Sequence, residues 1–252
     1  NIGIAYGMGM TAEKVADKWK VTREAQDLFA LESQRRATEA IKKGEFKNEI
    51  IPYTITDASP GRIGEIITSN KVIMNDEGPR ADTTIEALAK LKAVFSARGS
   101  VTAGNSSQMS DGAAAILLAS EKAIKKYNLV PLARFVSFAV AGVPPEIMGI
   151  GPKEAIPKVL KQAGIKQSNI DWFELNEAFA AQSLAVIHDL GLDPTKVNPL
   201  GGAIALGHPL GATGAIRTAT IVHGMKRHNL KYGIVTMCIG TGMGAAGLIE
   251  MV

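Results

Sequence analysis

The segment GGAIALGHPLGATG spans residues 201–214, and the segment CIGTGMG spans residues 238–244. The first places His208 inside a glycine-rich turn, and the second opens with Cys238, the single cysteine of the chain. Histidine and cysteine both titrate near neutral pH, and glycine-rich backbone leaves N–H groups free to bind a developing anion. The two segments therefore indicate acid–base or thiol chemistry beside an oxyanion site.

Strand and helix patterns alternate around these two turns. Strands are expected at 133–141, 171–175, 232–237 and 246–252, and helices at 120–127, 152–163, 177–190 and 212–226. Residues 112–119 form a continuous apolar run, which predicts one more strand, buried on both faces. This alternation predicts a layered α/β fold with helices on the faces of a sheet.

The first 110 residues read differently. A helix is expected from a cap at Thr22 to Gly44, a strand-like stretch at 48–55 and an irregular segment at 57–78, and Thr83 or Thr84 caps a further helix. Helices joined by long loops often carry function rather than a core.

Composition excludes several classes of protein. The chain has 252 residues, 46% of them hydrophobic and 21% charged, which is ordinary for one large or two smaller globular domains. The net charge of +4 comes from scattered lysines without interleaved aromatics, so we expect no nucleic-acid binding. No apolar run approaches the ~20 residues of a membrane span. A single cysteine excludes internal disulfides and fits a reducing compartment.

Each candidate residue also has a purely structural interpretation. Cys238 is either a reactive thiol delivered by a strand into a turn or a buried cysteine before a glycine hinge. His208 is either catalytic or an inert loop histidine. Asn176 either caps the following helix or holds a water in a polar pocket. The other three histidines fall on expected helices without acidic or cysteine neighbours, so no zinc site is expected.

Three motifs in this order resemble the thiolase family: Asn176–Ala180, Gly201–Gly211 and Cys238–Gly244. Weaker matches, at Gly104–Ser107, at Pro79–Arg80 with Thr84–Leu91, and at Met8–Glu13, extend the resemblance over the whole chain. It implies a thiolase-type layered α/β/α core with an inserted helical and loop domain. Residues 1–110 would be the loop domain covering the coenzyme A site, 111–130 the last strand and helix of the N-terminal core, and 131–252 the C-terminal domain.

The resemblance also implies a role for each site residue. His208 would activate a nucleophilic cysteine and, with a water held by Asn176, form one oxyanion hole. Cys238 would carry a proton, and the N–H of Gly240 would serve a second oxyanion hole. Ser107 would bond the pantetheine arm of coenzyme A, and Arg80 and Leu91 would approach its nucleotide end. Met8 and Phe179 would line the acyl pocket.

The implied reaction is acyl transfer between 3-ketoacyl-CoA and CoA, by thiolytic cleavage or the reverse condensation, with coenzyme A as a substrate and no cofactor or metal. The segments around Glu174 and Asp76 lean towards the degradative enzymes of fatty-acid β-oxidation. The nucleophilic cysteine and most of the N-terminal core have no match here. We therefore expect a fragment, inactive alone, of a homo-oligomer, dimer or tetramer.

Two alternatives remain open from the residues themselves. Cys238 and His208 would also suit a thiol hydrolase with Cys238 as nucleophile. The second alternative is a non-catalytic CoA-binding subunit that a partner chain completes. No charged and apolar leader is visible at Asn1, so this sequence contains no recognisable secretory signal. The expected compartment is the cytoplasm, with the mitochondrial matrix or the peroxisome as alternatives.

Overall fold

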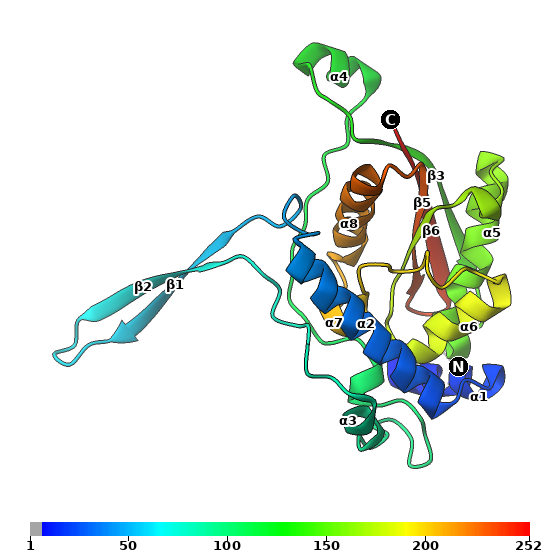
Figure 1. Cartoon of the computed structure of the whole chain (residues 1–252), viewed down its shortest axis with the longest axis horizontal. Coiled ribbons are helices and arrows are strands. Elements are labelled where there is room, and N and C mark those ends of the chain that lie inside the picture. The colour runs from blue at the N-terminus through cyan, green and yellow to red at the C-terminus, as the bar shows by residue number, and fades with distance from the viewer. Residues whose placement is uncertain (1–6) are drawn as a thin grey trace.

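The computed structural model describes residues 7–252, which form a layered body and a projecting hairpin (Figure 1). The first six residues of the expected loop domain lie outside the described residues. Among residues 7–252, no helix is long and apolar enough to cross a membrane.

A four-stranded sheet in the order β3-β6-β5-β4 is the middle layer of the body. β3 (Ala133–Gly142), β6 (Met243–Met251) and β5 (Tyr232–Ile239) are antiparallel neighbours. β4 (Trp172–Leu175) runs parallel to β5. These are the four strands that the sequence pattern predicts after residue 130.

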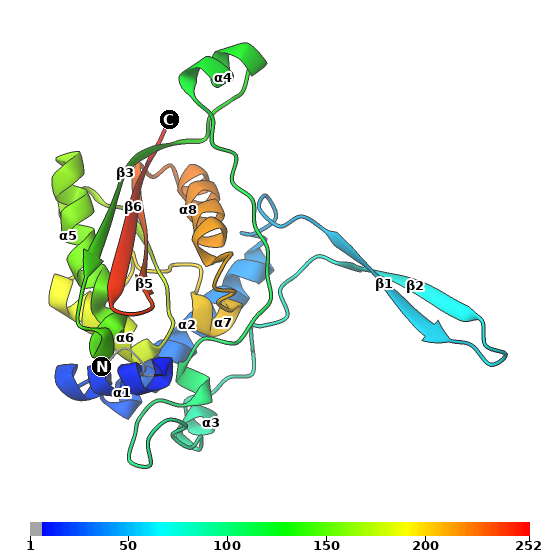
Figure 2. The same ribbon diagram turned by 180° about the vertical axis from the view of Figure 1, so that it is seen from behind.

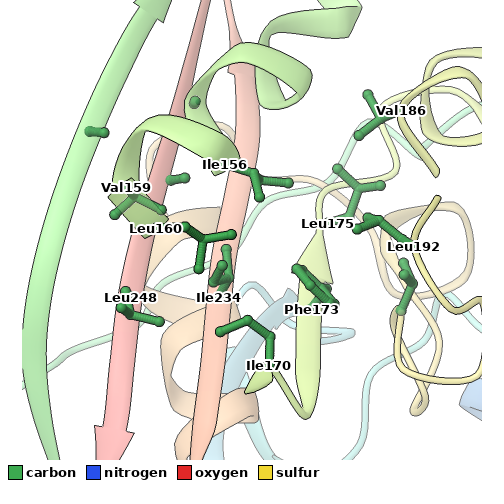
Figure 3. Packing of buried hydrophobic residues seen from close by; sticks show 14 of the residues in the cluster. Ile156, Val159, Leu160, Ile170, Phe173, Leu175, Val186, Leu192, Ile234 and Leu248 are labelled. Carbon is green, nitrogen blue, oxygen red and sulfur yellow. The ribbon is translucent and has the colours of Figure 1, made fainter. Parts of the chain in front are cut away.

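Helices cover both faces of this sheet, as Figure 1 shows. α5 (Gly151–Ala163) and α6 (Ala180–Leu190) lie on one face, and α8 (Thr213–His228) and α2 (Arg23–Lys43) lie on the other. Neighbouring strand residues point to opposite faces, so Ile234 packs against α5 while Val235 packs against α8. The first of these clusters is drawn in Figure 3. The predicted layered α/β fold is confirmed.

Capping signals correctly locate two helices within the first 110 residues. The Thr22 side chain accepts from Ala25 N–H at the start of α2, and Gly44 ends that helix with a φ of 72°. Thr84 caps α3 (Ile85–Ala89) in the same way. The remaining short helices join or flank these elements: α1 (Met8–Trp19), η2 (Ala103–Asn105), α4 (Glu121–Tyr127), η3 (Pro145–Ile150), η4 (Gln167–Asn169) and α7 (Ala203–Leu206).

A hairpin replaces the expected strand at 48–55 and the irregular segment at 57–78. β1 (Tyr53–Pro60) pairs with β2 (Ile66–Ile73) in an antiparallel register from Tyr53↔Ile73 to Pro60↔Ile66. Both strands are exposed along almost their whole length, and the hairpin extends away from the body (Figure 2). Its turn is closed by Gly61 N–H donating to the Glu65 carbonyl, with Gly64 at a φ of 91°. The irregular interpretation was wrong because polar residues in an exposed strand hide its alternation.

The predicted buried strand at 112–119 was also wrong. These residues are exposed and form no strand, and Leu117 and Leu118 are 82% and 79% exposed. An apolar run becomes a buried strand only when neighbouring strands accept its hydrogen bonds. Within residues 7–252, neither sheet includes this run.

Candidate active site

The loop before α8 is shaped around a buried carboxylate. Glu177 accepts hydrogen bonds from Ser33 Oγ at 2.6 Å, Asn198 Nδ2 at 2.8 Å and the Ile204 N–H at 3.2 Å. A Cβ on Gly202 would lie 1.9 Å from the Glu177 carboxyl carbon, so only glycine fits there. Burial is the main effect on the Glu177 carboxyl and raises its pKa. This carboxylate thus fixes the backbone that leads into the histidine turn.

His208 lies half-buried beyond this loop, between two polar side chains. Its Nδ1 is 2.6 Å from Thr213 Oγ1, and its Nε2 is 3.3 Å from Asn176 Nδ2. Burial first, and then the charge of Arg217, lower the pKa of His208 below its ordinary value. The ring is therefore neutral at neutral pH and able to accept a proton.

Asn176 follows β4 and joins the histidine turn to the sheet. Its backbone N–H donates to the Thr236 carbonyl on β5 at 2.9 Å, and its Oδ1 is buried with no hydrogen-bond partner among residues 7–252. The interpretation of Asn176 as a helix cap is wrong, because α6 begins at Ala180 with Phe179 as its N-cap residue. A buried amide oxygen without a partner calls for a water or a ligand group.

Cys238 stands near the end of β5, opposite Gly244 on β6, and two residues after Thr236. The half-buried Cys238 side chain packs against a hydrophobic cluster that includes Ala178 and Phe179 of the segment that carries Asn176. Burial raises the pKa of Cys238 to about 11, so the group is a protonated thiol at neutral pH.

The turn after Cys238 follows the expected glycine chemistry. Thr241 and Gly242 have φ of 67° and 96°, and Gly240 is exposed at the start of the turn. A Cβ on Gly242 would lie 2.2 Å from the Val143 carbonyl oxygen. The prediction that a strand delivers Cys238 into a tight glycine turn is confirmed.

The residues expected to hold the substrate reach this region from several segments. The Ser107 N–H donates to the Ala178 carbonyl at 2.9 Å, which places Ser107 beside the Cys238 contacts. Phe179 meets the Phe95 ring edge-on at a centroid distance of 6.0 Å, and Phe95 in turn covers Gly9, the neighbour of Met8. Phe179 therefore links the start of α1 to the thiol.

The two residues expected at the nucleotide end form hydrogen bonds through their backbone groups. The Leu91 carbonyl accepts from Arg23 Nη2 at 2.9 Å, and the Leu91 side chain packs against Gly104. The Arg80 N–H donates to Gln34 Oε1 at 2.7 Å, and Arg80 is exposed. The structure thus fixes the backbone at both positions.

A cavity of about 370 Å³ adjoins the histidine turn. Its wall combines residues 112–115 with Gly207, Pro209 and Thr213. Arg217 and Glu49 also line it, and Glu49 Oε1 accepts from Thr220 Oγ1 at 3.0 Å. Burial raises the pKa of Glu49 to about 7.

Sequence reasoning missed the buried polar groups behind His208, Cys238 and Asn176. Glu174 and Arg217 form a fully buried pair at 3.4 Å, and burial raises the pKa of Glu174 to about 7. Two further groups of this kind are Glu177, which accepts from Ser33, and Thr213, which contacts His208. The signal that could have found them is polar residues at positions where a core helix or strand should be apolar. Among residues 7–252, no three histidine, cysteine, aspartate or glutamate side chains gather as a metal site would require.

Two family descriptions match the sequence along almost its whole length: "Thiolase, N-terminal domain" over residues 3–122 and "Thiolase, C-terminal domain" over residues 129–251. The chain belongs to the thiolase family. It is 53% identical to the 3-ketoacyl-CoA thiolase of Bacillus subtilis over 97% of its own length and 62% of that protein. It is 52% identical to the human peroxisomal 3-ketoacyl-CoA thiolase over 96% of its own length and 57% of that protein.

Solved thiolase structures have the same fold. The acetyl-CoA acetyltransferase of Bacillus anthracis superposes with a TM-score of 0.91 at 46% identity, over 97% of this chain and 60% of that one. Human mitochondrial 3-ketoacyl-CoA thiolase in complex with CoA superposes with a TM-score of 0.89 at 42% identity, over 100% of this chain and 60% of that one. The chain thus spans about three fifths of the length of these thiolases.

Proposed function

We propose that this chain supplies the acid–base and oxyanion groups of a thiolase site that transfers an acyl group between 3-ketoacyl-CoA and CoA. The proposal depends on one observation above all: His208 Nε2 lies 3.3 Å from Asn176 Nδ2, while Asn176 Oδ1 is buried and has no hydrogen-bond partner among residues 7–252. A basic nitrogen beside a buried amide suits a base next to an oxyanion-binding water.

The proposed reaction divides between two thiols. The nucleophilic thiol attacks the β-carbonyl carbon of the 3-ketoacyl-CoA, its proton passes to His208 Nε2, and the oxygen that becomes negative is held by His208 and the water on Asn176. The Cα–Cβ bond then breaks, and the electron pair moves to the acetyl-CoA carbon, which takes the proton of Cys238. Cys238 then takes the proton of the CoA thiol, the resulting CoA thiolate receives the acyl group, and the departing nucleophile recovers its proton from His208.

Cys238 suits the proton-carrying role better than the nucleophilic one. Its pKa of about 11 keeps it protonated, whereas a nucleophile must be a thiolate. Since the chain has no other cysteine, the nucleophile of the proposed reaction comes from polypeptide beyond this sequence. The exposed apolar run at 112–119 and the cavity beside it favour completion of the site by further polypeptide.

The remaining roles follow from the same family. The N–H of Gly240 forms the second oxyanion hole, and Ser107 bonds the pantetheine arm. Arg80 and Leu91 approach the nucleotide, and Met8 and Phe179 line the acyl pocket. The complete protein acts as a dimer or tetramer in fatty-acid β-oxidation, and its compartment stays a prediction of cytoplasm, with peroxisome and mitochondrial matrix as the alternatives.

Reconstitution tests this proposal. The chain is mixed with a polypeptide that carries the remaining N-terminal part of the Bacillus subtilis relative, and thiolysis of acetoacetyl-CoA by CoA is followed. Turnover is expected in the mixture only, and His208→Asn should abolish it. A mixture that associates but shows no thiolysis would contradict the proposal. Acylation of Cys238 by the substrate would instead support a thiol hydrolase.

A further inference from the structure

Thr213 lies at the start of α8 and is almost completely buried, with 1% of its surface exposed. Its Oγ1 has two neighbours within hydrogen-bond distance. The Pro209 carbonyl oxygen is 2.9 Å away, and His208 Nδ1 is 2.6 Å away. A threonine hydroxyl has one proton to donate, so these two contacts constrain the positions of the Thr213 hydroxyl proton and of the His208 ring proton.

The Pro209 carbonyl accounts for the hydroxyl proton, because a carbonyl oxygen only accepts hydrogen bonds. This bond joins residue i to the carbonyl of residue i−4, which is the usual way a threonine hydroxyl is satisfied on a helix. With its proton directed to Pro209, Oγ1 meets His208 Nδ1 only as an acceptor. His208 Nδ1 must then carry a hydrogen.

The opposite side of the ring leads to the same assignment. A neutral imidazole has one N–H, so a hydrogen on Nδ1 leaves a lone pair on Nε2. Nε2 faces Asn176 Nδ2, which is a donor, at 3.3 Å. The reverse tautomer would need two changes together: the Thr213 hydroxyl would have to turn from Pro209 to the ring, and the Asn176 amide would have to present Oδ1 to Nε2.

We propose that Thr213 is a positioning residue that holds neutral His208 as the Nδ1–H tautomer and so leaves Nε2 as the base of the site. What Nε2 does with that lone pair rests on the proposed function, whereas the tautomer does not. When Nε2 takes the proton of the nucleophilic S–H, the products are a thiolate and an imidazolium. Its Nδ1–H still donates to Thr213, and the new N–H lies on Nε2.

Nuclear magnetic resonance of the ring nitrogens tests this directly on the 252-residue chain. The protein is labelled with ¹⁵N-histidine, and spectra that correlate ring carbon-bound protons with both nitrogens are recorded at about pH 8, above the ordinary histidine pKa of ~6.5. His208→Gln identifies the His208 signals. We expect a protonated Nδ1 and an unprotonated Nε2.

Two variants separate the hydroxyl from the packing of the side chain. Thr213→Ser keeps the hydroxyl and should keep the tautomer, whereas Thr213→Val keeps the shape and should shift the proton wholly or partly to Nε2. The signals of the other three histidines show whether each variant is folded. If Thr213→Val does not fold, the wild-type and Thr213→Ser spectra still decide which nitrogen carries the proton.

A wild-type ring protonated on Nε2, or a folded Thr213→Val variant with the wild-type tautomer, would overturn the proposal. Failure of the reconstituted thiolysis would leave these spectra unaffected, so the tautomer and the proposed function fail separately.

Discussion

Replacing Glu177 with glutamine should destabilise the fold strongly, although the two side chains have the same shape. One oxygen of Glu177 accepts from Asn198 Nδ2, and the other accepts from Ser33 Oγ and the Ile204 N–H. Asn198 is unable to turn its amide, because its Oδ1 accepts from the Leu175 N–H and its Nδ2 also donates to the Leu175 carbonyl. In either orientation of a glutamine side chain, its NH₂ group would therefore point at a hydrogen-bond donor: Asn198 Nδ2 on one side, or Ser33 Oγ and the Ile204 N–H on the other.

The magnitude follows from counting donors. Each orientation leaves at least two buried donors without an acceptor, and each costs about 1–3 kcal/mol. Glutamine also removes the burial of a negative charge, which offsets part of this loss. We expect Glu177→Gln to lower the free energy of unfolding by about 2–4 kcal/mol.

Urea unfolding followed by tryptophan fluorescence measures this difference, because Trp172 is buried in the sheet. The matched control is Glu77→Gln, the same substitution at an exposed loop position, which should stay within about 0.5 kcal/mol of wild type. If Glu177→Gln also stayed within that range, the carboxylate would not be what holds the loop before His208.

Three further predictions concern other ionisable groups. The pKa of Glu49 is about 7 in the folded protein against an ordinary 4.5, so between these pH values the folded protein keeps a proton that the unfolded chain has released. The contribution of this proton to the free energy of unfolding is complete below pH 4.5 and is lost as the pH rises to about 7. Glu49→Gln should remove that part of the slope in urea unfolding measured against pH, and an unchanged slope would refute the assignment. The pKa of Cys238, about 11 against an ordinary 9.0, should make the thiol react with iodoacetamide at pH 7.5 about 100-fold more slowly than a free cysteine. Mass spectrometry of the alkylated chain measures this rate, and a rate equal to that of free cysteine would count against the raised pKa. Asp27 accepts from Arg23 at 2.7 Å and from Asn105 at 2.9 Å, so Asp27→Asn should cost about 2–3 kcal/mol in the same urea assay, and a loss below 0.5 kcal/mol would show that the buried contacts are not used.

Sequence patterns located the elements whose signals are local. α2 is bounded by Thr22 and Gly44 because a side-chain cap and a left-handed glycine act within one turn. The same patterns failed for residues 112–119, because an apolar run does not specify which strands lie beside it.

The candidate site shows the same division. His208 and Cys238 stand out in the sequence because glycines surround them. The groups that orient them do not, since Thr213 and Glu177 act through hydrogen bonds to residues that lie from 4 to 144 positions away along the chain. Asn176 was ambiguous for a related reason: a cap and a site residue have the same side chain, and only the start of α6 at Ala180 separates them.

The most direct test of the account is whether the chain alone performs the chemistry. Incubated with acetoacetyl-CoA and CoA, it should produce no acetyl-CoA above background, and intact-mass spectrometry should find Cys238 without an acyl group. Clear thiolysis by the 252-residue chain, or a substrate-derived acyl group on Cys238, would contradict the claim that this chain holds the acid–base half of the site and not its nucleophile.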